Sequence, residues 1–203
     1  MKIKAFVSSL FIAGVLATSS LPAYAKTDTL IIAGGGFWSV ESDFSHIPGV
    51  IEVVSGYTGG TVANPTYELV ASKTTGHFEA VMVSFDDSMV SLQELVDYYW
   101  KTIDPTDAEG QFCDKGAPYR TALFYQNDTQ KQVFEQSLAE VTAKKPFKEA
   151  IVTQILPALP FYQAEEYQQD YFEKNPVSYK YYRRSCGRDD RVETLWGELV
   201  SDH

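Results

Sequence analysis

Two successive strand–helix–strand patterns restrict the folds that this 203-residue chain can adopt. Each pattern begins with a short β-prone run, continues with a helical segment, and ends with a second β-prone run. The expected strands are residues 29–33, 50–57, 77–85 and 120–125, and the expected helices are residues 37–46 and 92–103. Since such units build a split βαβ sheet, we expect an α+β fold, with a ferredoxin-like mixed sheet core and added helices.

Several further segments are expected to add to this core. Ser91, with a glutamate three residues later, forms a capping box for the second helix. Pro65 suits the first position of a helical turn that carries Tyr67. The other expected elements are a helix at 129–144, a strand at 151–156, and a C-terminal helix with Val192, Leu195, Trp196 and Leu199 on its apolar face. The tyrosine-rich chain after Pro157 is expected to wrap the core, and no long linker divides residues 26–203.

The first 25 residues have the features of a secretory signal peptide. Lys2 and Lys4 form a positive region, residues 5–16 are an apolar run, and Ala23-Tyr24-Ala25 matches a cleavage site. The run is shorter than the roughly 20 residues of a membrane span, which leaves an uncleaved amphipathic anchor as the alternative. We expect residues 1–25 to be a signal peptide and the protein to be exported to the periplasm.

The mature chain is acidic, which limits its partners. Its formal net charge is −10 before cleavage, and loss of the two signal-peptide lysines makes it −12. Such a protein repels nucleic-acid phosphates, so we expect no nucleic-acid partner. No second apolar span follows the first, so we expect no membrane attachment after cleavage, and we expect a monomer.

Two cysteines, Cys113 and Cys186, remain in the mature chain. Export and an even count allow a disulfide between them, but their separation does not require one. Four arginines surround Cys186, and their charge would favour a reactive thiolate. These arginines are Arg183, Arg184, Arg188 and Arg191. The alternative is that they pair at the surface with Asp189, Asp190 and Glu193.

The histidines are scattered along the chain rather than clustered. They lie at positions 46, 77 and 203, and none is at metal-ligand spacing from a cysteine. The sequence therefore supports neither a structural zinc site nor a haem site.

Glu79 is an acidic residue inside an otherwise apolar strand. Alternation along the segment His77-Phe78-Glu79-Ala80-Val81-Met82-Val83-Ser84-Phe85 places Glu79 on the same face as Val81, Val83 and Phe85. If that face is buried, desolvation raises the pKa of the carboxyl, which suits a general acid. If the opposite face is the core, Glu79 is solvated. Periodicity alone leaves both interpretations open.

Two loops hold further candidate residues. The turn Gly34-Gly35-Gly36-Phe37-Trp38 joins a strand to a helix, where backbone N–H groups stabilise negative charge and the aromatic rings could line an apolar pocket. Taken alone, the segment is better explained as an ordinary tight turn with core aromatics. Asp114 and Tyr119 lie in a second loop and could donate to or accept from a ligand oxygen, although turn chemistry also explains Asp114.

Taken together, these segments resemble the peptide methionine sulfoxide reductase A family over residues 30–197. The segments that carry the resemblance are 33–38, 56–60, 64–67, 75–81, 104–106, 114–120, 160–162, 164–165, 167–171 and 185–189. So many motifs in one order make the match specific. The resemblance implies that residues 26–203 form one methionine sulfoxide reductase A-like domain.

The resemblance also implies a stepwise thiol reaction. In this family a cysteine at the start of the glycine-turn helix attacks the sulfur of methionine S-sulfoxide, and Glu79 matches the acid that protonates the oxygen. The residues that match substrate-binding positions are Tyr67, Asp114 and Tyr119 for the oxygen, and Phe37 and Trp38 for the methyl group. Cys186 matches a resolving position, and a thioredoxin-type or other dithiol donor would reduce the resulting disulfide, without a metal or other cofactor.

This chain departs from the family at the nucleophile, because Gly36 occupies the cysteine position. Glycine has no side chain to attack sulfur, and Ser39 does not replace the thiol. Four interpretations follow: Cys113 and Cys186 substitute as thiols; the chain binds sulfoxides without reducing them; the pocket performs another reaction with Glu79 as acid; or Gly36 is an engineered or erroneous replacement.

Overall fold

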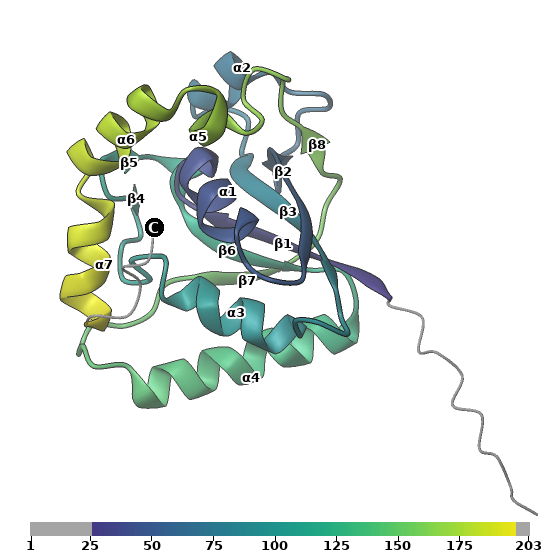
Figure 1. Ribbon diagram of the computed structural model, residues 1–203, viewed down its shortest axis with the longest axis vertical. Helices are drawn as coiled ribbons and strands as arrows, with labels where there is room; N and C mark the ends of the chain where they lie inside the picture. The colour runs from purple at the N-terminus through teal and green to yellow at the C-terminus, as the bar shows by residue number, and fades with distance from the viewer. Residues whose placement is uncertain (1–25, 198–203) are drawn as a thin grey trace, which may run out of the picture.

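The computed structural model describes residues 26–197, so the expected signal peptide and Leu199 lie outside this range. A six-stranded sheet forms its centre, in the order β7-β6-β1-β3-β2-β8 (Figure 1). The strands are β1 (Thr27–Gly34), β2 (Val50–Thr58), β3 (Phe78–Asp86), β6 (Thr121–Tyr125), β7 (Gln154–Pro157) and β8 (Tyr162–Gln163). All neighbours are antiparallel except β6 and β7. The order β6-β1-β3-β2 is that of a split βαβ sheet, so the expected α+β fold is confirmed.

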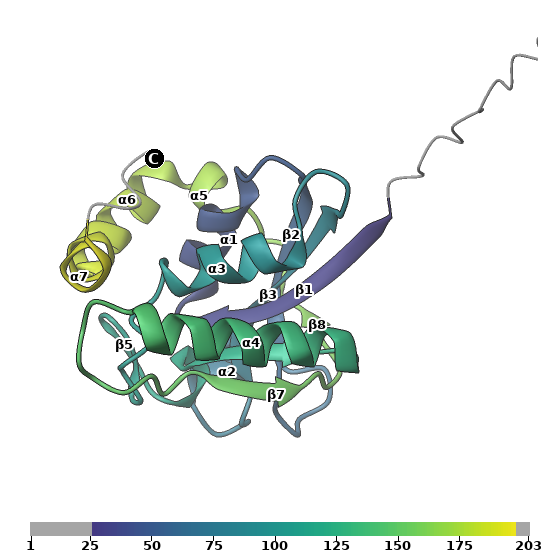
Figure 2. The same ribbon diagram turned by 90° about the horizontal axis from the view of Figure 1, so that it is seen from below.

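The helices pack mainly on one side of this sheet. Helices α1 (Phe37–Ser45) and α3 (Leu92–Trp100) cover the same face (Figure 2). The others are α2 (Tyr67–Ala71), α4 (Asp128–Lys144), α5 (Tyr171–Lys174), α6 (Pro176–Ser185) and α7 (Arg188–Trp196). The C-terminal helices α6 and α7 stand at one end of the sheet, beside the short hairpin of β4 (Gly110–Gln111) and β5 (Asp114–Lys115) (Figure 1).

Both faces of the sheet are buried, and strand alternation divides the apolar side chains between them. Leu30 and Ile32 of β1 join the main core under the helices, whereas Ile31 and Ala33 join a smaller cluster on the opposite face. Phe161, from the chain after Pro157, packs against that smaller cluster. The expectation that this part of the chain wraps the core is confirmed.

The helix ends predicted from local sequence patterns agree with the structure in some places and differ in others. The capping box of Ser91 and Glu94 is present at α3. The prediction for Pro65 is wrong, because Thr66 is the N-cap of α2 and accepts a hydrogen bond from the Leu69 N–H. Helices α5 and α6 were not predicted. Within residues 26–197, no helix has the length and apolar character to cross a bilayer.

Candidate functional site

The site is built around the turn from β1 to α1. Gly35 has a φ of +91°, which favours glycine, and an added Cβ there would lie 2.7 Å from Cβ of Gln111. Gly36 is the N-cap of α1 and has φ −57° and ψ 125°. Any L-residue adopts these angles, so the backbone requires glycine at position 35 but not at position 36.

The space beside Gly36 is occupied by a tyrosine that the sequence did not predict. A Cβ added at Gly36 would lie 2.5 Å from the hydroxyl oxygen of Tyr182 and 3.0 Å from Oδ2 of Asp114. The Tyr182 hydroxyl donates to that same carboxylate oxygen. A phenol–carboxylate pair therefore fills the place where the side chain of residue 36 would begin.

Glu79 lies on the face of β3 whose residues Val81 and Val83 join the main core, so the interpretation that this face is buried is confirmed. Its side chain is 3% exposed, Oε2 accepts from the Phe37 N–H at 3.1 Å, and Oε1 has no hydrogen-bond partner. Burial raises the pKa of Glu79 to about 8, and the nearby charge of Asp114 adds to the rise. At neutral pH the carboxyl is therefore mostly protonated and can donate a hydrogen bond.

The other predicted hydroxyl groups gather around this acid. Tyr67 and Tyr119 are half-buried, on α2 and on a short 3-10 helix (Ala117–Tyr119). Burial and the charge of Glu79 raise the pKa of Tyr67 to about 12, and the same causes raise the pKa of Tyr119. Both remain neutral hydroxyls over the physiological range, so they can donate to an oxygen near Glu79.

The two aromatic residues of the glycine turn have different environments. Phe37 is buried in the core and stacks on Tyr67, with ring centroids 6.4 Å apart. Trp38 is half-buried, and Tyr171 of α5 stacks on its ring at 3.7 Å. Tyr182 meets the Trp38 ring edge-on at 5.5 Å. The C-terminal helices therefore supply two aromatic rings that cover Trp38.

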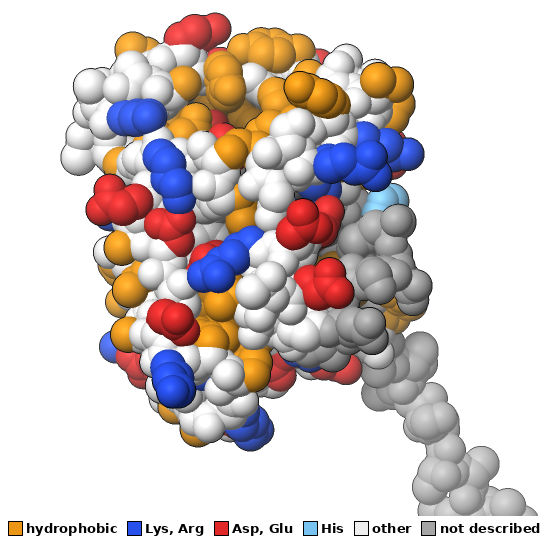
Figure 3. All heavy atoms as spheres, turned by 90° about the vertical axis from the view of Figure 1, so that its left-hand side faces the viewer, with side chains coloured by type: hydrophobic (Ala, Val, Ile, Leu, Met, Phe, Trp, Pro, Cys, Tyr) orange, Lys and Arg blue, Asp and Glu red, His pale blue; other side chains and the backbone are white. Residues whose placement is uncertain are grey.

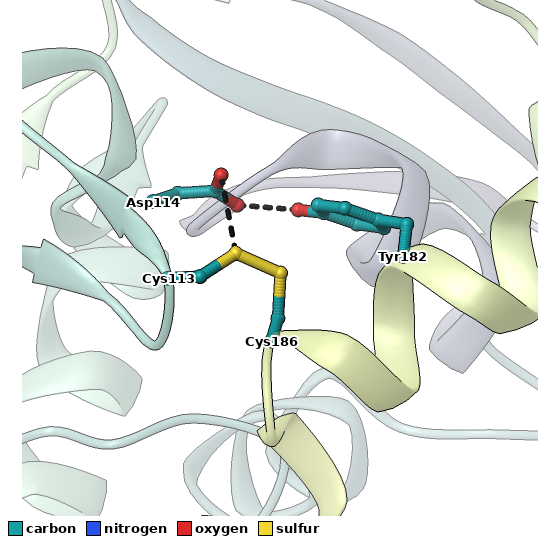
Figure 4. The surroundings of a disulfide bond; sticks show 4 residues. All are labelled: Cys113, Asp114, Tyr182 and Cys186. Atoms are coloured by element: carbon teal, nitrogen blue, oxygen red, sulfur yellow. Dashed lines mark hydrogen bonds between the residues drawn. A yellow bond between two sulfur atoms is a disulfide. The ribbon is translucent and has the colours of Figure 1, made fainter.

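Asp114 joins the site to the two cysteines. Cys113 and Cys186 form a disulfide, and Sγ of Cys113 lies 3.8 Å from Oδ1 of Asp114. In Figure 4, the carboxylate of Asp114 faces both the Cys113 sulfur and the Tyr182 hydroxyl. Burial raises the pKa of Asp114 above its ordinary value, although the Tyr182 hydroxyl and the Arg188 charge oppose the rise. Since both sulfurs are consumed in one bond, the described residues 26–197 hold no free thiol.

The arginines near Cys186 have acidic partners, as the surface-pairing interpretation expected, but two of the acids differ. Arg183 contacts Asp189 at 2.6 Å and also Asp43 at 2.6 Å. Arg191 contacts Asp104 at 2.7 Å. On the face that carries α6 and α7, basic and acidic side chains are interspersed (Figure 3). Arg183 and Arg191 are therefore paired with acids and do not supply the unpaired positive charge that was expected around Cys186.

Arg188 is a buried side chain that contacts the turn between β1 and α1. Its side chain is 3% exposed, donates to the Gly34 carbonyl at 3.1 Å and lies over the ring of Phe112. It also lies 3.5 Å from the buried Asp43. Sequence reasoning treated Arg188 only as a neighbour of Cys186, because its contacts come from segments far away in the chain.

The fold also brings Cys113, Asp114 and Cys186 within 4.8 Å of one another, although their spacing in the sequence gave no sign of a ligand set. The two sulfurs are bonded to each other, so they are not thiolate ligands in this state.

The fold and site together define an α+β domain with neutral acid and phenol donors at a helix N-terminus, and with no sulfur at residue 36. A sequence model of the family described as peptide methionine sulfoxide reductase matches residues 28–200. The chain belongs to this family.

Individual relatives agree with this assignment. The peptide methionine sulfoxide reductase MsrA of Bacillus licheniformis is 48% identical over 172 residues, which cover 85% of this chain and 95% of the relative. MsrA 2 of Caulobacter vibrioides is 46% identical over 192 residues, which cover 95% of this chain and 96% of the relative. Among solved structures, methionine sulfoxide reductase A of Corynebacterium diphtheriae is 31% identical, with a TM-score of 0.66 over 74% of this chain and 76% of its own. Reduced Mxr1 from Saccharomyces cerevisiae is 28% identical, with a TM-score of 0.71, and the match covers 81% of this chain and 94% of that chain.

Proposed function

We propose that this protein binds methionine-S-sulfoxide in exported proteins or peptides and does not reduce it through residue 36. The observation that carries the proposal is the contrast at the site. Glu79 is buried with an unpartnered oxygen, whereas Gly36 has no side chain and its place is taken by the Tyr182–Asp114 pair.

The donors that remain suit a sulfoxide oxygen. That oxygen is a strong acceptor without a proton, so it needs neutral donors. A protonated Glu79 and the Tyr67 and Tyr119 hydroxyls are such donors at neutral pH. Their low-dielectric surroundings strengthen each hydrogen bond.

The missing group is the one that would accept oxygen. Reduction requires a nucleophile that bonds to sulfur and is then reduced itself. Neither the backbone of Gly36 nor the phenol of Tyr182 has an oxidised state equivalent to a sulfenic acid. Removal of a covalent nucleophile leaves only the residual catalysis of the surrounding site, which lies orders of magnitude below normal rates.

Binding and turnover can be measured on the same peptide. We expect a methionine-S-sulfoxide peptide to bind the purified mature protein saturably and to retain its oxygen in mass spectra after incubation with dithiothreitol. The matched R-sulfoxide and unoxidised peptides should bind more weakly, because they place no oxygen at the same donors. Equal binding of all three peptides would contradict sulfoxide recognition.

The pH dependence of binding should follow Glu79. Because the neutral carboxyl donates the hydrogen bond, affinity should be constant below the pKa of about 8 and should fall as the pH rises through it. The Glu79→Gln variant keeps a neutral donor and should lose this dependence. Isothermal titration between about pH 6 and about pH 10 measures both profiles. The control is Glu68→Gln, which changes an exposed acid next to Tyr67 and should retain the wild-type profile. If the affinity of Glu79→Gln still fell with rising pH, Glu79 would not be the titrating hydrogen-bond donor.

A second candidate function is sulfoxide reduction by the remaining cysteines. The observation in its favour is that Cys113 adjoins Asp114, which itself lies beside the Gly36 position. In that mechanism, reduction of the disulfide frees Cys113 to attack the sulfoxide, and Cys186 resolves the product. If the natural protein rapidly removes the oxygen from the peptide and Cys113→Ser does not, this candidate is established and the first is excluded.

The setting of the protein is also part of the proposal. A periplasmic location follows from the signal-peptide pattern, and a thioredoxin-like or other dithiol donor would serve any disulfide chemistry. The acidic mature chain would act there as a monomer, without nucleic acid or membrane partners.

A further inference from the structure

We propose that Glu41 is a positioning residue for the sulfoxide site. Its carboxyl holds the backbone N–H of Asp170, and this contact fixes the ring of Tyr171 against Trp38. The inference rests on the proposed function, since Trp38 is the ring expected to contact the methyl group of the sulfoxide. Glu41 and Trp38 belong to α1, and α5, which begins with Tyr171, lies beside this helix (Figures 1 and 2). Glu41 acts through α5 and does not contact the substrate itself.

Glu41 is a carboxyl in the interior of the protein that the proposed binding chemistry does not use. Its side chain is 0% exposed, and the Asp170 N–H donates to both carboxyl oxygens, each at 3.1 Å from the nitrogen. Burial of a carboxyl is unfavourable unless the group is hydrogen-bonded, and here burial raises the pKa of Glu41 to about 7. The contact with Asp170 therefore supplies the hydrogen bond that a buried carboxyl needs.

Asp170 depends on its surroundings because its backbone conformation is uncommon. It is the N-cap of α5 and has a φ of +52°, in the left-handed region that residues other than glycine rarely adopt. Such a conformation persists where neighbouring contacts hold it. Tyr171 follows directly, so the backbone of Asp170 sets the direction from which the Tyr171 ring projects. That ring stacks on Trp38, with centroids 3.7 Å apart and planes 6° from parallel.

The two residues before this cap are fixed by contacts that do not involve Glu41. Gln168 accepts a hydrogen bond from the Trp38 indole N–H at 2.8 Å. Gln169 accepts from the Ser55 N–H and donates to the Ser55 carbonyl, each at 2.9 Å. Loss of the Glu41 contact should therefore release the start of α5 without moving Trp38 or separating this segment from β2.

Quenching of Trp38 fluorescence by iodide reports whether the stacked ring covers the indole. Trp100 and Trp196 are buried, and the signal of Trp38 is the difference between each protein and the same protein with Trp38→Phe. Glu41→Ala removes the acceptor, so quenching of Trp38 should rise about twofold as one face of its ring is uncovered. Glu41→Gln keeps an acceptor oxygen and should retain the natural quenching. Val96→Ala, which opens a cavity in the core under α3, controls for lost stability and should also retain it.

Binding of the methionine-S-sulfoxide peptide tests whether the position of Tyr171 matters to the site. Glu41→Ala should weaken binding about fivefold, the effect of losing one aromatic contact, and Tyr171→Ala should weaken it equally. Because Glu41 acts through Tyr171, the double variant Glu41→Ala/Tyr171→Ala should bind as Tyr171→Ala does. A merely structural role would give a further loss in the double variant. Glu41→Gln should bind as the natural chain does.

The two measurements separate this inference from the proposed function. If no peptide binds the natural chain, the proposed function fails, and the quenching still decides whether Glu41 fixes Tyr171. Unchanged quenching or affinity in Glu41→Ala, a gain of quenching in Glu41→Gln, or an additive loss in the double variant would each overturn the positioning role. If Glu41→Ala does not fold, Glu41→Asp replaces it with the same expected results, because its side chain is one methylene too short to keep the contact with Asp170.

Discussion

The double variant Gly36→Cys/Tyr182→Phe should reduce a methionine-S-sulfoxide peptide about 10³-fold faster than the natural chain, in the presence of dithiothreitol. The expected gain is large because the variant restores a covalent nucleophile to a site whose acid and hydroxyl donors are retained. The backbone at residue 36 already has angles that cysteine adopts. The helix N-terminus would favour its thiolate.

The second substitution is needed because of the space beside residue 36. A Cβ there would lie 2.5 Å from the Tyr182 hydroxyl oxygen, whereas the ring carbon that bears this hydroxyl is 3.6 Å away. Phenylalanine therefore removes the overlapping atom and leaves an ordinary van der Waals contact with the ring, while Oδ2 of Asp114, which lies 3.0 Å from the Cβ position, must shift slightly. Gly36→Cys alone should be less active than the double variant, because Tyr182 or the new side chain must shift.

Mass spectrometry of the peptide measures the activity, and circular dichroism checks the fold. Gly36→Ser/Tyr182→Phe is the matched control, since it has the same shape at residue 36 without a thiol, and it should stay at the natural level. If the folded cysteine variant shows no gain over this control, the assignment of Glu79 and its neighbours to a sulfoxide site is contradicted.

Loss of the Cys113–Cys186 bond should cost about 4 kcal/mol of unfolding free energy. The bond closes a loop with a sequence separation of 73 residues, and opening it enlarges the unfolded ensemble. For a domain of this size, the thermal midpoint should fall by roughly 8–16 °C. Urea denaturation of Cys113→Ser/Cys186→Ser against the oxidised natural chain measures the difference.

The reduced natural chain supplies the control for this prediction. Dithiothreitol should lower the stability of the natural chain to nearly that of the double serine variant, and it should leave the variant unchanged. A difference below about 1 kcal/mol between oxidised and reduced chains would show that the bond does not constrain the unfolded state.

The parts of the fold that the sequence predicted are those with strong local signals. The Ser91 capping box and the alternation in β3 act within a few residues, and the structure agrees with them. Strand β8 has two residues and therefore no period to detect. Helix α6 buries only Tyr179 among its ten residues, so its apolar pattern is weak.

The site was predictable to the extent that its groups lie in motifs. Glu79 stood out as a carboxyl inside an apolar strand, but only the packing of both sheet faces decided that it is buried. The Tyr182 contact with Gly36 depends on where α6 lies against α1, which no local pattern specifies. The disulfide was one of two sequence alternatives, and the approach of Cys186 to the β4–β5 hairpin selected it.

The most direct test uses the natural mature chain after reduction and alkylation of Cys113 and Cys186, incubated with a methionine-S-sulfoxide peptide and excess dithiothreitol. We predict that the peptide binds and leaves with its oxygen, because no remaining group can accept it. Rapid and complete conversion to the unoxidised peptide by this thiol-blocked protein would contradict the account.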